Sequence, residues 1–343
     1  MITGLDLPLV FTGVIALSVL LYVVLDGFDL GVGILFPFAR SANDRDVMMN
    51  TIAPVWDGNE TWLVLGGNAL LACFPLAFAV LMPAFYLPIL LMLIALILRG
   101  VAFEFRFRAR SRGRALWTAL FAAGSIGSAF SQGLVLGGFI QGVEVVDGRF
   151  AGGPLDWLTP YTLLVAAGVT VGYALLGATW IVLKTEDELH GDARRWAGLA
   201  GAGVTAFLTV VSVATLFVHP RIAARWGFTE AGLDVARLAP LLAVPMLGLA
   251  GLALLTTGVR RKAHRTPFIG ALLLFLSGYI GLAVSFTPFI VPYAMSYEQA
   301  AAAPNTLSLM LVVFGVMMPL ILGYTAWVYF IFRGKVRPDA GYH

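Results

Sequence analysis

The sequence predicts an all-α integral membrane protein with nine transmembrane helices. Two observations lead to this fold class. Only 12% of the 343 residues are charged and 59% are hydrophobic, whereas soluble domains carry about 25% charged residues. The hydrophobic residues also form uninterrupted runs of about 20, the length that a helix needs to cross a bilayer, and not the short alternating strands of a membrane barrel. We therefore expect one membrane domain over residues 1–343.

The apolar runs define the nine expected helices in order. Prolines mark several of their ends, because proline interrupts helical hydrogen bonding. Little more than Pro75 and Pro83 separates the second run from the third, so these two are expected to form a tight hairpin. Pro288 and Pro292 mark the place where the eighth leaves the membrane. The expected spans are 8–37, 60–78, 79–98, 115–141, 160–183, 197–218, 237–258, 267–290 and 306–332.

Basic residues give the expected orientation. With the N-terminus outside, 18 of the 22 Lys and Arg residues fall in cytoplasmic segments, as the positive-inside rule requires. The C-terminus is then cytoplasmic. The first residues carry no positive region and no small-residue cleavage site, so we expect no removable signal peptide.

Four carboxylates near the start of the chain are the most informative polar residues. Asp26 and Asp29 lie in the first apolar run, and Asp57 and Glu60 lie at the start of the second. Members of each pair are three residues apart and share a helix face. A charged side chain at the centre of a bilayer costs about 2.5–3.5 kcal/mol on insertion scales. The predicted orientation places both pairs on the cytoplasmic side, as a route for protons or cations or a docking site for a charged partner.

Structural roles for these residues remain open at the level of sequence. Asp57 at an N-cap with Glu60 three residues later would form an acidic capping box, which is compatible with proton handling. Asp26 and Asp29 could pair with a buried donor. Arg99, at the end of the third run, either extends to the membrane surface or serves as a counter-charge for Asp57 and Glu60.

Metal-ligating residues are few. Cys73 is the only cysteine, so the chain has no internal disulfide and no cysteine-ligated metal site. The four histidines are expected in loops, at span ends or in the tail: His190, His219, His264 and His343. We therefore predict no metal site and no heme iron ligand in this chain. Any redox centre would belong to another subunit, and no nucleic-acid partner is predicted.

Small residues at helical spacing indicate close packing. Gly27 and Gly31 are four apart in the first run, and Gly133 and Gly137 are four apart in the fourth. Such pairs allow helices to approach closely in a membrane.

Three segments together resemble subunit II of the bd-type quinol oxidases, including their cyanide-insensitive relatives. They are Asp-Gly-Phe-Asp-Leu-Gly-Val-Gly at 26–33, Ala-Pro-Val-Trp-Asp-Gly-Asn-Glu-Thr-Trp at 53–62 and Arg-Gly-Val-Ala-Phe-Glu-Phe-Arg at 99–106. The resemblance extends over the whole chain in length and layout. It implies a first four-helix bundle at 8–141, a second at 142–290 and a peripheral helix at 306–332.

The resemblance also implies a function. Members work in a bacterial inner-membrane complex that oxidises quinol and reduces dioxygen to water. Subunit I holds the quinol site and the hemes, either b and d or b only, while subunit II ligates no heme iron and is not catalytic alone. A small single-span accessory subunit and membrane lipids are further expected partners. A structural quinone or lipid could also bind.

The matching positions imply individual roles. Asp57 matches the acid that takes up cytoplasmic protons, with Trp56, Asp29 and Arg99 as neighbours of that route. The predicted proton path therefore comprises Asp57, Glu60, Asp29 and Asp26. Glu60 departs from the Gln of some members, and is either a second relay or a partner of Arg99. Trp62 is similar to an aromatic residue that lines an apolar passage for oxygen.

Two other functions fit some of these features. Intramembrane acids also occur in proton- or cation-coupled secondary transporters, but the inverted repeats of such proteins have no counterpart in the second half of this chain. A structural scaffold, in which the acids only bind subunit I, is the other alternative.

Overall fold

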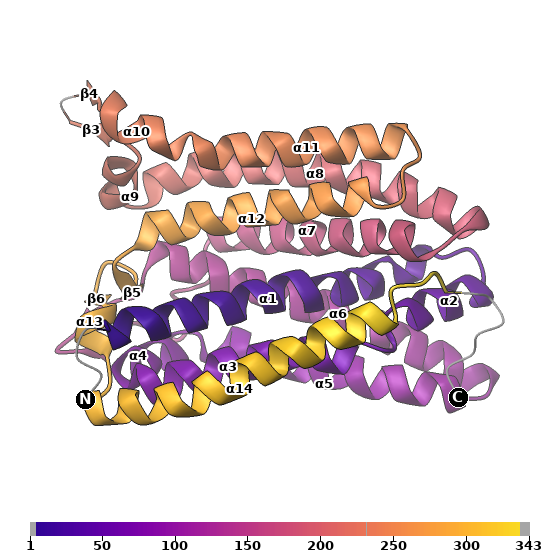
Figure 1. Cartoon of the computed structure of the whole chain (residues 1–343), viewed down its shortest axis with the longest axis horizontal. Coiled ribbons are helices and arrows are strands. Elements are labelled where there is room, and N and C mark those ends of the chain that lie inside the picture. The colour runs from indigo at the N-terminus through magenta and orange to yellow at the C-terminus, as the bar shows by residue number, and fades with distance from the viewer. Residues whose placement is uncertain (1–4, 231, 337–343) are drawn as a thin grey trace.

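The computed structural model describes residues 5–230 and 232–336. Arg337 and His343, which entered the predictions above, lie outside the described residues, as does the start of the chain. The described part is almost entirely helical, and its long helices run side by side along the longest axis of the molecule (Figure 1). Helix α1 begins at one end of this axis, and α14 finishes at the other.

The first half of the chain contains six α-helices, a short 3-10 helix and one hairpin. Their bounds are α1 (Leu7–Leu35), η1 (Phe36–Phe38), α2 (Ala42–Ile52), α3 (Trp56–Cys73), α4 (Pro75–Ala84), α5 (Tyr86–Arg108), α6 (Ser111–Gln141), β1 (Val145–Val146) and β2 (Arg149–Phe150).

The second half contains the remaining long helices and two further antiparallel hairpins. Their bounds are α7 (Pro160–Lys184), α8 (Asp187–Val218), α9 (Pro220–Arg225), β3 (Phe228–Thr229), β4 (Gly232–Leu233), α10 (Val235–Leu241), α11 (Ala243–Arg260), α12 (Thr266–Phe286), β5 (Phe289–Val291), β6 (Met295–Ser296), α13 (Tyr297–Ala300) and α14 (Pro304–Ile331).

Eight helices within the described ranges are long and apolar enough to span a membrane. They correspond to the first expected span and to the third through the ninth. Helix α3, which covers the second expected span, is not among the eight. Its first turns hold Asp57, Asn59 and Glu60, so its 18 residues do not form an apolar stretch of spanning length.

The predicted tight hairpin between the second and third spans is wrong in detail. Helix α3 ends at Cys73, and the non-helical backbone of Phe74 precedes a separate ten-residue helix, α4. Pro75 begins α4, where its fixed backbone and missing N–H are tolerated. The third long helix then begins at Tyr86 instead of residue 79, and continues ten residues beyond Leu98 to Arg108.

Two other features of the helix bounds were not predicted. The seventh expected span lies within one candidate span, Val235–Arg260, in which a turn at Leu242 separates α10 from α11. The expected connection after the first span contains an unpredicted helix, α2, whose start is stabilised by a capping box between Ser41 and Asp44. The eighth helix ends at Phe286, before Pro288, as the prolines predicted.

Glycines bring α1 and α7 into backbone contact. A methyl group at Gly31 would lie 1.9 Å from the carbonyl oxygen of Tyr173, and one at Gly177 would lie 2.2 Å from the carbonyl carbon of Gly31. Gly133 of α6 meets the backbone of Ala166 on α7 in the same way. The prediction that these glycines permit close helix approach is confirmed.

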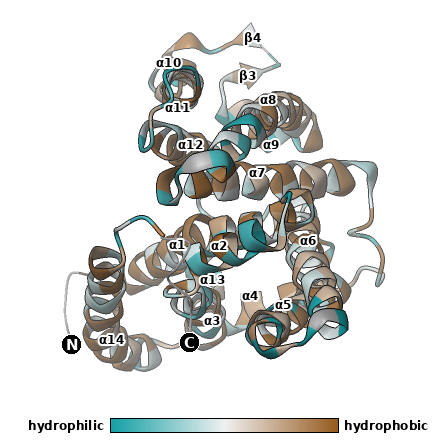
Figure 2. Cartoon of the chain, turned by 90° about the vertical axis from the view of Figure 1, so that its right-hand side faces the viewer, coloured by the Kyte–Doolittle hydropathy of each residue, from teal (hydrophilic) through white to brown (hydrophobic). Residues whose placement is uncertain are grey.

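The long helices fall into two neighbouring groups when they are viewed end on (Figure 2). Helix α7 packs against α8 and α12, and α11 packs against α12; α1 packs against α3 and α6, and α5 packs against α6. Contacts of α7 with α1 and α6 join the groups. Helix α14 lies at the margin, against α1 and α3. The group formed by α1, α3, α5 and α6 contains the acidic residues.

Candidate functional site

Helix α1 carries two carboxylates into the interior of the protein. Asp26 and Asp29 are both completely buried, within a stretch of α1 whose every residue from Asp26 to Leu35 is buried. The small side chains of Gly27, Gly31 and Gly33 let α6 and α7 cover this stretch closely. The acids therefore face a protein environment built by the surrounding helices.

Arg99 of α5 forms a buried ion pair with Asp26. Its Nη1 atom donates to Asp26 Oδ1 at 2.7 Å, and the Arg99 side chain is only 2% exposed. Its Nη2 atom lies 3.7 Å from Glu60 Oε2, whose side chain is 30% exposed. The guanidinium also lies 6.0 Å from the ring centroid of Trp56. Arg99 thus links α1, α3 and α5.

Only one of the two predicted partners of Arg99 pairs with it. The ion pair with Glu60 is confirmed, whereas the carboxylate partners of Arg99 among the described residues do not include Asp57. Instead, Asp26 takes the closer position. The sequence left open whether Asp26 pairs with a buried donor, and Arg99 is that donor.

The N-terminus of α3 contradicts the capping-box hypothesis. Val55 occupies the N-cap, and no side chain caps the helix. Asp57 lies one residue inside the helix and is exposed, while Glu60 is half-buried. An acid in the first turn still interacts favourably with the helix dipole. Asp57 therefore lies at the surface of this subunit, in the first turn of α3.

Asn59 of α3 contacts the second buried acid. Its Nδ2 donates to Asp29 Oδ2 at 2.7 Å and to the backbone oxygen of Leu25 at 3.3 Å. The hydroxyl of Tyr329, from α14, donates to Asn59 Oδ1 at 2.9 Å. Within the described ranges, the other oxygen of Asp29, Oδ1, has no hydrogen-bond partner from the protein.

A chain of polar side chains extends from Asp26 toward the opposite end of α1. Gln132 of α6 donates to the hydroxyl of Tyr22 at 2.7 Å and to Ser128 at 3.1 Å. The hydroxyl of Tyr173, on α7, donates to Gln132 Oε1 at 2.7 Å. Tyr22 lies one turn before Asp26 and interacts with its carboxylate. The acidic site is thus the end of a longer buried polar network.

The two predicted tryptophans have different surroundings. Trp56 is half-buried and its ring lies 5.0 Å from that of Phe103. Trp62 is buried with Tyr22 and Met318, and its Nε1 has no partner in the part of the chain that the structure describes. Trp62 therefore lies among apolar side chains, next to the polar network and not within it.

Within this site, negative charge exceeds positive charge. Three carboxyl groups, Asp26, Asp29 and Glu60, surround one guanidinium, that of Arg99. Buried charges without a partner are costly. The site can therefore hold a proton, which is the chemistry expected of a proton-transfer route.

The described histidines do not fit a heme iron. The ring of His219 stacks on that of Tyr293, and its Nδ1 accepts a hydrogen bond from the backbone amide of Arg221. The ring centroids of His190 and His264 lie 4.6 Å apart, at the opposite end of the long helices. No group of three or more metal-ligating side chains occurs within residues 5–230 and 232–336.

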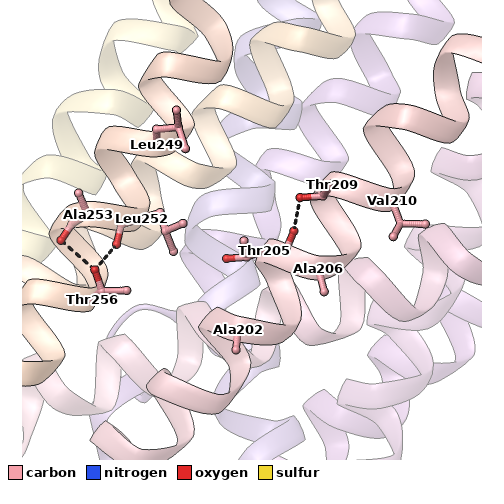
Figure 3. Close-up of a pocket in the computed structure, with 9 residues that line it drawn as sticks. All are labelled: Ala202, Thr205, Ala206, Thr209, Val210, Leu249, Leu252, Ala253 and Thr256. Carbon is pink, nitrogen blue, oxygen red and sulfur yellow. Dashed lines mark hydrogen bonds between the residues drawn. The ribbon is translucent and has the colours of Figure 1, made fainter.

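An apolar groove lies between α8 and α11 (Figure 3). Its volume is about 780 Å³. The hydroxyls of Thr205, Thr209 and Thr256 are bonded to carbonyl groups of their own helices. The groove therefore offers a ligand apolar surface and contains none of the predicted site residues.

Sequence reasoning missed several members of the site. These are Tyr22, Asn59, Gln132, Tyr173 and Tyr329. Asn59 and Gln132 are amides within apolar helices, and that feature could have identified them. The tyrosines gave no such signal, because tyrosine is common in membrane helices.

Comparisons with known proteins agree with one another. Residues 7–332 match the family model described as cytochrome bd terminal oxidase subunit II. Cytochrome bd-I ubiquinol oxidase subunit 2 of Escherichia coli (strain K12) is 32% identical over 356 residues, covering 93% of this chain and 92% of that protein. Cytochrome bd ubiquinol oxidase subunit 2 of Bacillus subtilis (strain 168) is 29% identical over 321 residues, covering 91% of each.

One solved structure supports the fold. The chain is similar to a chain of the bd oxidase from Geobacillus thermodenitrificans, with a TM-score of 0.75 and 15% sequence identity. The match covers 96% of this chain and 99% of that one. At this identity the likeness shows the fold alone.

Proposed function

Because the chain belongs to the cytochrome bd terminal oxidase subunit II family, we propose that it supplies part of the cytoplasmic proton-uptake path of a quinol oxidase. The chain is a subunit of an oxidoreductase complex in the bacterial inner membrane. The observation that carries the proposal is the series of carboxyl groups from exposed Asp57, through half-buried Glu60, to buried Asp26 and Asp29, the last three of which lie around Arg99.

The proposed route follows one face of α3 inward. Asp57 collects a proton at the surface of the subunit, and Glu60, one turn further, receives it. From Glu60 the proton reaches the buried pair on α1 near Arg99. Carboxyl groups suit such a relay because each can both accept and release a proton. Trp56 and Arg99 orient the entrance, and Trp62 lines an apolar passage for oxygen.

The rest of the complex supplies the redox chemistry. We propose that subunit I carries the hemes, b and d or b only, together with the quinol site, and that this chain ligates no heme iron. When bound there, the hemes pass electrons from quinol to dioxygen. A single-span accessory subunit, lipids and a structural quinone or lipid remain proposed partners of the complex.

We also propose the arrangement of this chain in the membrane. Nine spans, with α3 and α4 together as the second, place the N-terminus outside and the C-terminus in the cytoplasm. The division into bundles at 8–141 and 142–290, with 306–332 peripheral, is supported by the packing of α1, α3, α5 and α6 in one group and α7, α8, α11 and α12 in the other.

Substituting Asp57 tests the uptake proposal. Asp57→Asn in the assembled complex should retain the heme spectrum and lose most oxygen consumption, since the amide cannot carry a proton. Glu104→Gln, which changes an exposed acid of α5, should retain activity. Full activity of Asp57→Asn would leave this chain only a scaffolding role.

The transporter alternative makes a different prediction. A secondary transporter should take up its substrate when the chain is expressed without partners. Family membership and the absence of a repeated acidic site in the second half of the sequence favour the oxidase subunit. Uptake by the isolated chain, driven by a proton gradient, would favour the transporter.

A further inference from the structure

The two buried acids of α1 have different partners. The titratable and charged groups that face Asp29 are Asp26 on its own helix, Glu60 on α3, Arg99 on α5 and Tyr329 on α14. Of these, only Arg99 is a cation. If all three carboxyls were ionised, the cluster would carry an uncompensated negative charge in a medium of low dielectric constant, at a large cost in free energy. At least one carboxyl therefore holds a proton.

The contacts of Asp26 favour its ionised form. Arg99 donates to Oδ1 at 2.7 Å. The hydrogen bonds of the polar network all run toward Tyr22: Tyr173 donates to Gln132, and Gln132 donates to Tyr22. Since the hydroxyl of Tyr22 already accepts a hydrogen bond, its own proton is left for an acceptor. The Asp26 carboxylate, one turn along α1, interacts with this hydroxyl.

The contacts of Asp29 favour a carboxyl that can be protonated. Among the described residues, the side chain that donates to it is the neutral amide of Asn59, and none of the ion pairs of these residues includes Asp29. Tyr329 donates to the oxygen of the Asn59 amide, which turns the NH₂ group toward Asp29 Oδ2. Within the described ranges, Asp29 Oδ1 and Asp26 Oδ2 are both buried without a protein hydrogen-bond partner. Because Arg99 pairs with Asp26 and not with Asp29, Asp29 Oδ1 is the atom that can take the proton.

We infer that Asn59, fixed by Tyr329, positions Asp29 as the buried carboxyl that gains and loses the proton, while Asp26 stays ionised beside Arg99. This assignment rests on the proposed uptake function and gives the two buried acids different roles within it. An O–H bond forms at Asp29 Oδ1 when a proton arrives through Glu60, and it breaks when the proton leaves toward the partner subunit. Asn59 and Tyr329 are positioning residues and carry no proton.

Infrared difference spectroscopy of the assembled complex tests the assignment. A protonated carboxylic acid has a carbonyl-stretching band that shifts in D₂O. Asp29→Asn should remove this band and Asp26→Asn should keep it. If Asp29→Asn does not assemble, Asp29→Glu should shift the band instead. A band lost in Asp26→Asn and unchanged in the Asp29 variant would overturn the assignment, as would the absence of a band in the unsubstituted complex.

The positioning role has its own readout. Asn59→Ala should shift both the frequency of the band and the pH at which it disappears, and Tyr329→Phe should shift them in the same direction by less. Tyr279→Phe is the matched control, because it removes a tyrosine hydrogen bond to the backbone of α1, at Ala16, outside the acidic site. Equal shifts in the control and in Asn59→Ala would refute the role of Asn59.

This test is separate from the test of uptake. The band is measured in the resting complex and requires no turnover. Loss of oxygen consumption in Asp57→Asn bears on the uptake path, whereas the fate of the band in the Asp29 and Asp26 variants bears on the division between the two acids. Full activity of Asp57→Asn, together with a band that belongs to Asp29, would refute uptake through Asp57 and would still support Asp29 as the protonated acid.

Discussion

At the scale of the residue, Arg99 joins the acidic site together. It is almost completely buried, pairs with Asp26 at 2.7 Å and lies 3.7 Å from Glu60. The net contribution of Arg99 to protein stability does not follow from its attraction to the acids alone. The free-energy cost of removing all of these charges from water opposes that attraction. The consequence of removing only the cation is clearer.

Arg99→Gln should destabilise the protein by about 3–5 kcal/mol, because it leaves buried carboxylates unpaired. The double variant Arg99→Gln/Asp26→Asn should recover part of this loss, since it also removes the closest negative charge. The midpoint of thermal unfolding of the purified complex measures both. Arg108→Gln, at the exposed end of the same helix, is the control, and a loss as large in Arg108→Gln would contradict the argument.

The sequence identified the acids and missed the amide between them. Asp26 and Asp29 were conspicuous because charge is rare in an apolar run. Asn59 was not singled out, since its partner Asp29 lies 30 residues away in the sequence. The capping hypothesis for Asp57 failed for a local reason: the helix begins one residue before it, at Trp56.

At the scale of the element, α1 is the helix around which the site is built. It packs on α3, α6 and α7, and its contact with α7 is made through backbone atoms at Gly31 and Gly177. Close backbone approach gains dispersion contacts that larger side chains would prevent, which is how helices associate in lipid. The glycines therefore set the distance between the two groups of helices.

Gly31→Ala should destabilise the protein by about 1–3 kcal/mol or more, because the added methyl meets the Tyr173 carbonyl and forces the helices apart. Gly13→Ala is the matched control on the same helix, since its methyl would meet nothing within 4 Å. That control should be neutral or stabilising by up to about 1 kcal/mol. Thermal unfolding separates the two, and equal effects would show that the contact is unimportant.

The segment after α14 is held by contacts with the connection between α7 and α8. Lys335 lies 2.7 Å from Glu186, and the amide of Val336 donates to the backbone oxygen of Lys184. The hydrogen bond and the charge of Lys335 lower the pKa of Glu186. The stabilisation that this ion pair provides is therefore present at pH values above the ordinary glutamate pKa. It is lost as the pH falls through the lowered pKa of Glu186.

Glu186→Gln should accordingly increase the rate of amide hydrogen exchange at 332–336 at neutral pH, by a small factor because the pair is exposed. In the unsubstituted protein the same increase should occur only at acidic pH. Glu188→Gln, at an exposed position of the same helix, is the control. Unchanged exchange in Glu186→Gln would show that the backbone contact of Val336 and the hydrogen bonds from Lys184 to the backbone of Phe332 and Gly334 hold the segment without the ion pair.

At the scale of the whole molecule, the predicted orientation follows from charge. The cytoplasmic side predicted from the basic residues is also the side on which the proposed carboxyl route would open at Asp57. A proton taken up there and consumed inside the complex moves charge across part of the membrane without a pump. The proposed mechanism therefore depends on the predicted topology.

Cysteine labelling can test this topology, because the only native thiol, Cys73, is buried. Arg149→Cys, in the hairpin after α6, should react with a membrane-impermeant maleimide in intact cells whose outer membrane has been removed. Arg261→Cys, between α11 and α12, should react only after permeabilisation. Both positions are exposed in the chain. The reverse pattern would invert the orientation and place Asp57 outside.

The sequence by itself determined the membrane fold, most of the long helices, the acids and the family, because hydrophobic run length and rare intramembrane charges are local signals. The break at Phe74, the division at Leu242 and the extra helix α2 depend on local backbone conformation that hydrophobicity does not encode. Only the tertiary structure decided which acid meets Arg99, and it brought Asn59, Gln132 and Tyr329 to the site. These contacts join different helices, and their partners are fixed by how those helices pack, which no single apolar run specifies.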